Sequence, residues 1–455
     1  MTTAKQTRAL PFTRTLQVRR EADVVVAGGG PAGMAAAVTA ARQGARVFLV
    51  EAMNCLGGMG TAGMLPVFMP FADAVHFYAG GFGRELHDRL ERDGGTIAAK
   101  PWGPLLPVIR AEGLKRIYDA MAVEAGVEFL LTTHVAAVEA EAGQMTHVVC
   151  AAKSGLFALA AKVFVDCTGD GDLCAWAGTP FENGDEHGHV MGATLCSLWT
   201  GIAWDAVNAA GQHAETTLID ELRRNPGVLP QPDPHLPGIL PLGPAMGGGN
   251  VGHSYGVDGT DEASLTQGNV FARRLLPAYE RFYRQHMKGY ERLSLEATAS
   301  QLGVRESRRI RGDYVLNRAD YDRRAVFPDE IGRYNYWIDT HLSQPALDDF
   351  GDHMKLRAAP LKPGESYGIP FRCLTPRGLD NVLVAGRCVS TDRAVQSSLR
   401  VMPGCFITGQ ACGMAAAMMA GGAITSRAVD VRDLQSRLLA IGAFLPNFHA
   451  ATVES

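Results

Sequence analysis

The sequence predicts an α/β protein with a doubly wound parallel sheet, interrupted by a second domain of mixed α+β structure. Three observations support this. The apolar run "ADVVVAGGG" (residues 22–30) ends in glycines and precedes an Ala-rich helix and a second apolar run. Similar apolar runs return at 161–167 and 381–388. Between about 201 and 360 the composition changes to clustered prolines and charged amphipathic helices, which indicates an inserted substrate or cap domain.

The composition limits the partners and the compartment. The chain has 455 residues, too many for one compact core. A net charge of −4 gives no long-range attraction to nucleic acid or an anionic membrane, so we expect a small-molecule substrate. Nine scattered cysteines without a regular framework favour a cytoplasmic location. The uncharged stretch 24–41 contains five helix-breaking Gly and Pro residues, so we expect no membrane span.

The first βαβ unit is predicted from three consecutive segments. β-Branched residues at 22–27 predict a buried strand, "PAGMAAAVTAARQGA" (31–45) predicts a helix with Gly44 as its C-cap, and "RVFLVE" (46–51) predicts the next strand. The unit spans about thirty residues, the usual length of a βαβ unit. Further along, 114–141 predicts a helix and a strand pair, and 161–178 a strand, a Gly/Asp turn and a short helix.

The glycines of this unit predict a dinucleotide site. Gly28 permits a tight turn, Gly30 permits close approach of a pyrophosphate, and Gly33 permits close helix–strand packing. Pro31 and Ala32 begin the helix, whose N-terminus supplies N–H donors. Glu51, followed by Ala52, ends the second strand, where a carboxylate suits a ribose diol and repels a 2′-phosphate.

Further turns at strand ends predict a long cofactor. Gly57 and Gly58 follow Glu51, and Thr168, Gly169 and Asp170 follow another strand. A third strand ends at Gly386 and Arg387. Ligands of doubly wound sheets bind at the carboxyl ends of strands. Several glycine turns converging there indicate an extended dinucleotide, and we therefore expect a Rossmann-type domain that binds FAD.

These patterns give the expected domain boundaries. We assign 20–72, 104–200 and 366–455 to a discontinuous FAD-binding domain, 73–103 and 201–365 to the cap domain, and 1–19 to an N-terminal extension.

A second glycine motif lies in "MGGGNVGHSYG" (246–256), through Gly247, Gly249 and Gly252. A proline-rich segment precedes it and no Ala-rich helix follows it. The context of a dinucleotide fingerprint is therefore missing. We interpret the stretch as a flexible loop of the cap that carries His253.

Six ordered motifs resemble one protein family. They are "DVVVAGGGPAGMAAAVTAARQGARVFLVE", "FVDCTGDGDLCAWAG", "GVRESRRIRGDYVL", "FPDEIGRYNYWIDTH", "YGIPFRCLTPRGLDNVLVAGRCVST" and "SLRVMPGCFITGQACGMAAA". Together they resemble the FAD-dependent oxidoreductase family of bacteria, within the glutathione-reductase-type flavoprotein superfamily. The resemblance covers roughly residues 20–445. No C-x-x-x-x-C follows the first unit, so a dithiol relay is not expected.

The resemblance implies roles for particular residues. Gly28, Gly30, Gly33 and Glu51 would hold the ADP half, and Gly57 and Gly58 would follow the pyrophosphate. Val135 would meet adenine through its backbone, or be an ordinary core residue. Asp170 follows the Gly/Asp turn of the family, and Gly386 and Arg387 would approach the ribityl-phosphate side. Gly409 would open the last helix, whose positive end would face flavin N1 and O2.

The substrate side offers three catalytic candidates. His253 is a candidate general base, and Arg305 and Arg400 are candidates to offset negative charge on substrate or flavin. His341 is an alternative base, with Asp339 as its partner or a ligand of substrate. Four aromatic residues are either weaker candidates or core: Tyr334, Tyr336, Trp337 and Tyr367.

No metal site is expected. The acidic, histidine-containing segments "FENGDEHGH" (181–189) and "LDDFGDHM" (347–354) match no compact ligand set.

From the motifs and the resemblance we expect an FAD-dependent dehydrogenase or oxidase that takes a hydride from a small alcohol or amine. It needs an electron acceptor that the sequence does not identify, and it can form a homo-oligomer. An NAD(P)H-dependent flavin reductase or hydroxylase, and a non-catalytic FAD-stabilised scaffold, are the alternatives.

Overall fold

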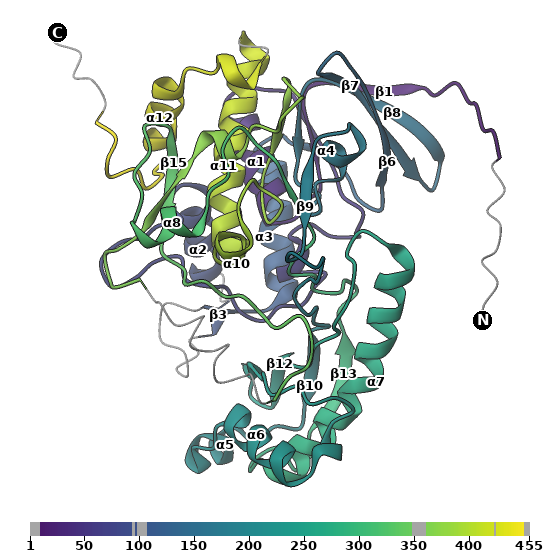
Figure 1. Cartoon of the computed structure of the whole chain (residues 1–455), viewed down its shortest axis with the longest axis vertical. Helices are drawn as coiled ribbons and strands as arrows, with labels where there is room; N and C mark the ends of the chain where they lie inside the picture. The colour runs from purple at the N-terminus through teal and green to yellow at the C-terminus, as the bar shows by residue number, and fades with distance from the viewer. Residues whose placement is uncertain (1–9, 93–95, 98–106, 348–360, 423–424, 450–455) are drawn as a thin grey trace.

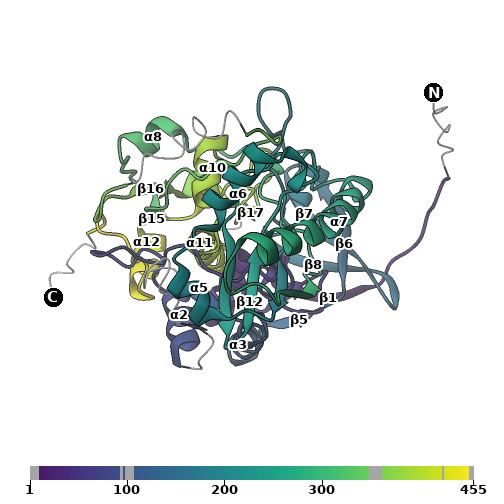
Figure 2. The same cartoon turned by 90° about the horizontal axis from the view of Figure 1, so that it is seen from below.

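The computed structural model describes residues 10–92, 96–97, 107–347, 361–422 and 425–449. Figure 1 shows a first part, built on the largest sheet and its helices, and a cap below it, formed by strands and helices between residues 197 and 298. Seen from below, the helices of the cap lie in front of the first part (Figure 2). The predicted α/β fold with a parallel sheet is therefore observed.

Within the described residues, the sheet of the first part has seven strands, five of which run parallel to one another. Their order is β5-β2-β1-β8, with β17 on the other side of β8. The strands are β1 (Val18–Ala27), β2 (Val47–Val50), β5 (Glu128–Leu130), β8 (Gly155–Asp166) and β17 (Val382–Val384). In β1, β2 and β17 these are the apolar runs that the sequence predicts as buried strands. The carboxyl ends of all five strands lie at one edge of the sheet because the strands run in the same direction.

Helices form a layer on one face of this sheet, with α1 and α11 directly on its strands and the others packed beside these two or beside each other. They are α1 (Pro31–Arg42), α2 (Phe82–Arg92), α3 (Ala111–Glu124), α8 (Arg318–Asp322), α10 (Arg393–Leu399), α11 (Met402–Gly421) and α12 (Val431–Ala440). The pair α1 and α11 packs most closely, because small residues face each other. A Cβ atom on Gly409 would lie 2.2 Å from the carbonyl oxygen of Ala32. The segment 73–103, which we assigned to the cap, contributes α2 to this core.

The position of Gly409 corrects one sequence prediction. We predicted that Gly409 opens the last helix, but α11 begins at Met402, after Val401 as its N-cap. Pro403 lies in the first turn of this helix, where proline is favoured because its missing N–H is not needed there. Gly409 serves the contact with α1 instead.

The opposite face of the sheet packs against a β-hairpin. β6 (His134–Glu141) and β7 (Gln144–Ala152) pair antiparallel, and β7 pairs with the first half of β8. Side chains of this hairpin and of α4 (Asp172–Trp176) form a second apolar cluster with Val25 and Phe48.

The cap is a four-stranded antiparallel sheet in the order β11-β12-β10-β13, with three helices. Its strands are β10 (Ser197–Thr200), β11 (Gly238–Gly243), β12 (Met246–Asn250) and β13 (Ser294–Thr298), and its helices are α5 (Trp204–Ala210), α6 (Ala214–Arg224) and α7 (Glu262–His286). The apolar faces of α6 and α7 form their own core with Trp199.

The second glycine motif is not a flexible loop. Gly247, Gly248 and Gly249 are buried in β12, a central strand of the cap sheet. The prediction was wrong because glycine has low strand propensity, and here tertiary packing decides. A Cβ atom on Gly249 would lie 2.4 Å from Nε1 of Trp199, so this strand needs residues without side chains. Gly252, just beyond the strand, has a φ of +75°.

Among the described residues, three two-stranded sheets lie apart from the two larger ones. β9 (Phe181–Asn183) pairs with β14 (Arg308–Ile310), β15 (Glu330–Tyr334) with β16 (Tyr367–Pro370), and β3 (Thr96–Ile97) with β4 (Val108–Ile109). In the described ranges, 3-10 turns lie at Gly58–Gly60, Pro226–Val228, Phe371–Cys373 and Ser426–Ala428. Among the described residues no single helix has the length and hydropathy to cross a membrane. In the part of the chain that the structure describes, the pair α10 and α11, bent by 93° at the break between them, meets that requirement by length and composition alone.

Candidate functional site

A cavity of about 1730 Å³ extends from the carboxyl edge of the parallel sheet to the helices of the cap. Its first end is lined by Gly28, Glu51 and Thr168, which follow β1, β2 and β8. Its far end is lined by cap residues that include Trp204 and Tyr290. The edge where parallel strands end is the usual ligand site of open α/β sheets. The fold therefore places this cavity where the sequence predicts a cofactor.

The first glycine turn leaves room for a ligand at one glycine only. Gly28 has a φ of +95°, and a Cβ atom there would lie 2.4 Å from the carbonyl oxygen of Cys167. A Cβ atom on Gly33 would lie 1.8 Å from the carbonyl oxygen of Gly28. At Gly30, by contrast, a Cβ atom would meet nothing within 4 Å, and Gly30 lines the cavity. The open side of the turn thus faces the cavity at the N-terminus of α1.

Glu51 is held by backbone donors at the edge of the cavity. Its carboxylate accepts hydrogen bonds from the N–H of Gly29 (2.6 Å) and the N–H of Met53 (2.7 Å). Burial raises the pKa of Glu51, and the backbone donors oppose that shift. The carboxylate is therefore fixed next to the glycine turn, where the sequence places the partner of a ribose diol.

Asp170 and Arg387 form an ion pair across two strand ends. Nη2 of Arg387 lies 2.6 Å from Oδ1 of Asp170, which also accepts a hydrogen bond from the hydroxyl of Ser307. Nε of Arg387 is buried and has no hydrogen-bond partner within the described ranges. Such an unsatisfied donor on a cavity wall fits a ligand rich in acceptor oxygens.

Asp172 lies beside this pair and also lines the cavity. Burial raises the pKa of Asp172 to about 6, and the neighbouring carboxylates of Asp170 and Asp166 add to the shift. Arg308 opposes it through an ion pair of 2.7 Å.

These features fit FAD: an open glycine turn, a fixed carboxylate, a helix N-terminus and an unsatisfied guanidinium N–H. Most residues that we predicted to hold the cofactor line the cavity: Gly28, Gly30, Pro31, Ala32, Glu51, Ala52, Gly58, Val135, Thr168, Gly169, Asp170, Gly386 and Arg387. Gly33, Gly57 and Gly409 do not line it. Gly57 has a φ of +102°, and a Cβ atom there would lie 2.5 Å from the ring of Tyr118, so its role is in the turn.

Three histidines from separate segments meet between the cap and the first part. The ring centroids of His235 and His341 are 5.0 Å apart, and both rings lie 5.5 Å from that of His253. Nδ1 of His253 lies 2.9 Å from Oδ2 of Asp233, and Nε2 of His253 is buried without a partner in the described part of the chain. Burial lowers the pKa of His253 to about 4, so its ring is uncharged at neutral pH.

The structure changes the ranking of the predicted bases. His235 and His341 line the cavity, whereas His253 is not among its lining residues. His253 lies 3% exposed, because its loop turns inward after the buried strand β12. Burial and the nearby Arg305 lower the pKa of His341 well below its usual value. Of the two histidines considered from the sequence, the alternative, His341, is therefore the one that a cavity ligand can reach.

Both predicted arginines line the cavity. Nη1 of Arg305 donates to the carbonyl oxygen of Gly192 (2.5 Å) and to the hydroxyl of Thr194 (2.9 Å). Nη2 of Arg400 donates to the backbone and side chain of Asp339 (3.1 and 3.2 Å). Nε of Arg400 is buried and unpartnered among the residues described.

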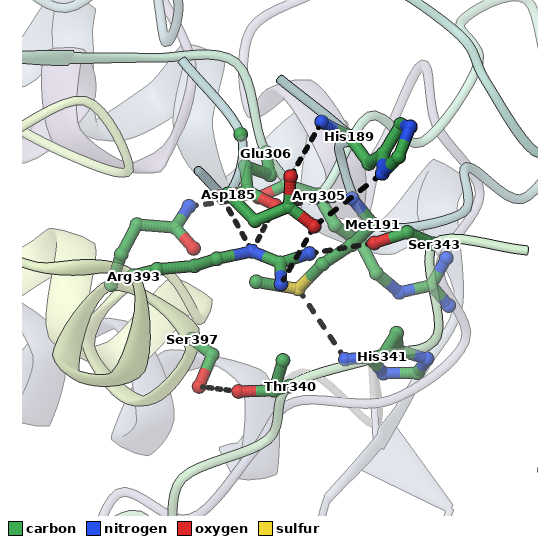
Figure 3. A network of polar contacts seen from close by, with 12 residues as sticks. Asp185, His189, Met191, Arg305, Glu306, Thr340, His341, Ser343, Arg393 and Ser397 are labelled. Carbon is green, nitrogen blue, oxygen red and sulfur yellow. Dashed lines mark hydrogen bonds and ion pairs between the residues drawn. The ribbon is translucent and has the colours of Figure 1, made fainter. Parts of the chain in front are cut away.

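A buried ionic network supports this wall (Figure 3). Glu306 is fully buried and lies 3.0 Å from Nε of Arg393 and 2.6 Å from Nη1 of Arg309. The same carboxylate accepts the N–H of Met191, and the sulfur of Met191 accepts the N–H of His341 at 3.4 Å. The network thus fixes the backbone beside His341.

Tyr336 and Trp337 line the cavity, as the sequence allows, whereas Tyr334 and Tyr367 do not. Sequence reasoning offered an ion pair of Glu306 with a neighbouring arginine as an alternative, which Arg309 provides, but it missed His235, Asp233 and the contacts of Glu306 with distant segments. The sequence did contain a pattern that could have drawn attention to Asp233 and His235. Asp233-Pro-His235 and Asp339-Thr-His341 share the pattern D-x-H. Of the two acidic segments, 181–189 contains Asp185 of the network beside Arg393, and 347–354 lies outside the described residues except for Leu347.

Residues 23–438 match the profile of a family described as FAD dependent oxidoreductase. Among curated proteins nothing matches. A geranylgeranyl bacteriochlorophyll reductase-like protein from Thermoplasma acidophilum is 11% identical, with a TM-score of 0.47 over 93% of this chain and 84% of that chain. A p-nitrophenol 4-monooxygenase from Pseudomonas putida DLL-E4 is 13% identical, with a TM-score of 0.45 over 93% and 87%.

Proposed function

The chain belongs to the FAD-dependent oxidoreductase family, and we propose that it oxidises a small polar alcohol or amine by hydride transfer. The family match confirms the predicted FAD cofactor and the enzymatic nature of the protein. The observation that carries the proposal is the shared cavity. The glycine turn, Arg305, Arg400 and His341 all line it, so one ligand space connects the cofactor residues to a polar wall.

The residues of the first part would hold FAD. The open glycine turn at Gly30 and the N-terminus of α1 would face the pyrophosphate, and Glu51 would face the ribose. Arg387 would donate its unsatisfied Nε–H to an acceptor oxygen of the cofactor. When bound, FAD supplies the hydride acceptor, N5 of the isoalloxazine. The first turn of α11, at Val401 and Met402, lines the same cavity with its positive end.

The two arginines would bind and orient the substrate. Arg305 and Arg400 each keep part of the guanidinium in protein hydrogen bonds, which fixes its plane. A fixed guanidinium suits a carboxylate, so we propose a substrate that carries an acidic group next to the oxidised carbon. Tyr336 and Trp337 would close the apolar side of the space and exclude water.

His341 would accept a hydrogen bond from the hydroxyl or amine group and take up its proton. Its uncharged ring lines the cavity, and its Nε2 lies 3.4 Å from Oδ2 of Asp339. A neutral imidazole next to a carboxylate can accept a proton and share the resulting charge. His253, the base that we predicted first, lies behind this ring and would support it. The nine cysteines are all buried and unpaired, which supports the proposal of a reducing, cytoplasmic location.

The test is anaerobic mixing of the FAD-loaded enzyme with substrates. We expect bleaching of the flavin with 2-hydroxy or 2-amino acids and slower bleaching with neutral alcohols and amines. His341→Ala should slow flavin reduction far more than it weakens FAD binding, whereas His253→Ala should have the smaller effect on reduction. If NADH or NADPH bleaches the flavin rapidly and no alcohol or amine does, the protein is instead an NAD(P)H-dependent reductase or hydroxylase.

A further inference from the structure

The three histidines at the cavity form a set of nitrogen atoms with the spacing of a metal site. One ring nitrogen from each of His235, His253 and His341 lies within 4.8 Å of the other two. The residues come from three segments: the chain before β11, the loop after β12 and the chain after β15. No helix or strand periodicity brings them together. Their convergence is therefore a product of the tertiary fold.

Each histidine has a carboxylate against its ring. Nδ1 of His235 lies 2.9 Å from Glu215. Nδ1 of His253 lies 2.9 Å from Asp233, and Nε2 of His341 lies 3.4 Å from Asp339. In metal sites a ligating histidine almost always donates its second N–H to a carboxylate, a carbonyl or a water, which fixes the tautomer and turns the other nitrogen to the metal. The cluster repeats that arrangement three times.

His253 adds an independent observation. Its imidazole is 3% exposed, and its Nε2 is buried without a hydrogen-bond partner among the described residues. Because Nδ1 faces Asp233, the carboxylate assigns the proton to Nδ1 and leaves a lone pair on Nε2. A buried acceptor without a partner costs free energy unless a ligand satisfies it. The rings of His235 and His341 both lie next to this ring.

We propose that His235, His253 and His341 bind a divalent transition-metal ion of the zinc type. Imidazole ligands favour zinc and its neighbours in the first transition row, whereas calcium and magnesium prefer oxygen ligands. Three histidine ligands leave a fourth tetrahedral position open, as in catalytic zinc sites. The open position points to the cavity, because His235 and His341 line it.

The ion would hold the hydroxyl or amine group of the substrate at the cavity wall. With the ion bound, His341 is a ligand and takes up no proton, so the role of base proposed for it above applies to the enzyme without the ion. The role of the ion in holding the substrate rests on the proposed function, whereas the binding of the ion rests on the geometry of the cluster alone. Metal binding and substrate oxidation are therefore measured separately.

The experiment uses the FAD-loaded enzyme, treated with a chelator and then titrated with Zn²⁺ against a chromophoric competitor. We expect one tightly bound zinc per FAD in the wild type. His253→Ala and His341→Ala should abolish this binding, and Asp233→Asn should weaken it about 10- to 100-fold. The control is His87→Ala, because His87, Asp88 and Glu91 on α2 are the other candidate metal group within the described residues. That variant should keep the full zinc content.

X-ray absorption at the zinc edge of the wild type gives a result that does not depend on the folding of any variant. It should show three imidazole nitrogens at about 2.0–2.1 Å. Absence of tight zinc binding, or zinc that is retained in both histidine variants, overturns the site. If zinc binds as expected and no alcohol or amine reduces the flavin, the site stands and the proposed function is wrong.

Discussion

The carbonyl oxygen of Gly28 lies 1.8 Å from the point that a Cβ atom on Gly33 would occupy. Backbone atoms on both sides leave no room for a methyl group, so Gly33→Ala must displace α1 from the sheet. We expect a loss of unfolding free energy of about 3 kcal/mol, at the upper end for an overpacked core. Urea unfolding measures it, and FAD should be lost together with stability.

Gly30→Ala separates cofactor contact from packing. A Cβ atom on Gly30 would enter open space at the cavity, so the fold should tolerate it within about 1 kcal/mol. FAD affinity should fall at least about tenfold, because the methyl group takes space that the pyrophosphate needs. The matched control is Gly421→Ala, another open position at the far end of α11, which should keep FAD. Normal FAD affinity in Gly30→Ala would show that the cofactor does not approach this turn.

Arg400 provides a test of substrate orientation. Arg400→Lys keeps the positive charge but loses the planar fork that donates to Asp339. For a substrate with an acidic group, we expect KM to rise about 10- to 100-fold, since a hydrogen bond to a charged group is worth about 1.5–3 kcal/mol. Steady-state kinetics with the acidic substrate and its neutral analogue measure the change. An equal rise in KM for both would exclude a carboxylate partner for Arg400.

Glu306 tests the network behind the cavity wall. Removing its carboxylate in Glu306→Ala leaves the buried guanidinium of Arg309 and the half-buried one of Arg393 without their shared partner. We expect a loss of about 3–5 kcal/mol of unfolding free energy. Asp88→Ala breaks the exposed pair with Arg84 and should cost less than about 1 kcal/mol. Similar losses in both variants would mean that the network does not stabilise the fold.

The raised pKa of Asp172 predicts that the free energy of unfolding depends on pH. Burial raises its pKa from 3.8 to about 6 in the folded protein, so the folded state binds its proton at pH values where the unfolded chain has released it. The free energy of unfolding should therefore fall as pH rises from about 4 to 6, by at most about 3 kcal/mol from this group. Asp172→Asn should lack this part of the fall. Urea unfolding of both proteins at equal FAD saturation measures it, and identical pH profiles would contradict the prediction.

The cofactor side could be predicted from sequence because its signals are local. The glycine turn, Glu51 and the Ala-rich helix lie within one βαβ unit, where strand, turn and helix follow each other in order. Gly409 was placed at the start of its helix by the family resemblance, and it was misplaced because that helix begins at Met402. Which glycine of a helix meets a neighbouring helix depends on tertiary packing.

The polar wall could not be predicted, because it is assembled from distant segments. His235, His253 and His341 come together only when the cap folds over the sheet. The glycines of β12 misled the prediction for the same reason. Their partners, Trp199 and Pro66, lie far away in the sequence, and only their packing shows why the strand lacks side chains.

Anaerobic flavin reduction by a substrate deuterated at the oxidised carbon tests the central claim most directly. If a substrate C–H bond breaks as hydride at the flavin, a 2-hydroxy or 2-amino acid bleaches the wild-type flavin, and deuterium slows the bleaching. Reduction that occurs only with NADH or NADPH, or that is equally fast with protium and deuterium at every substrate concentration, would contradict it.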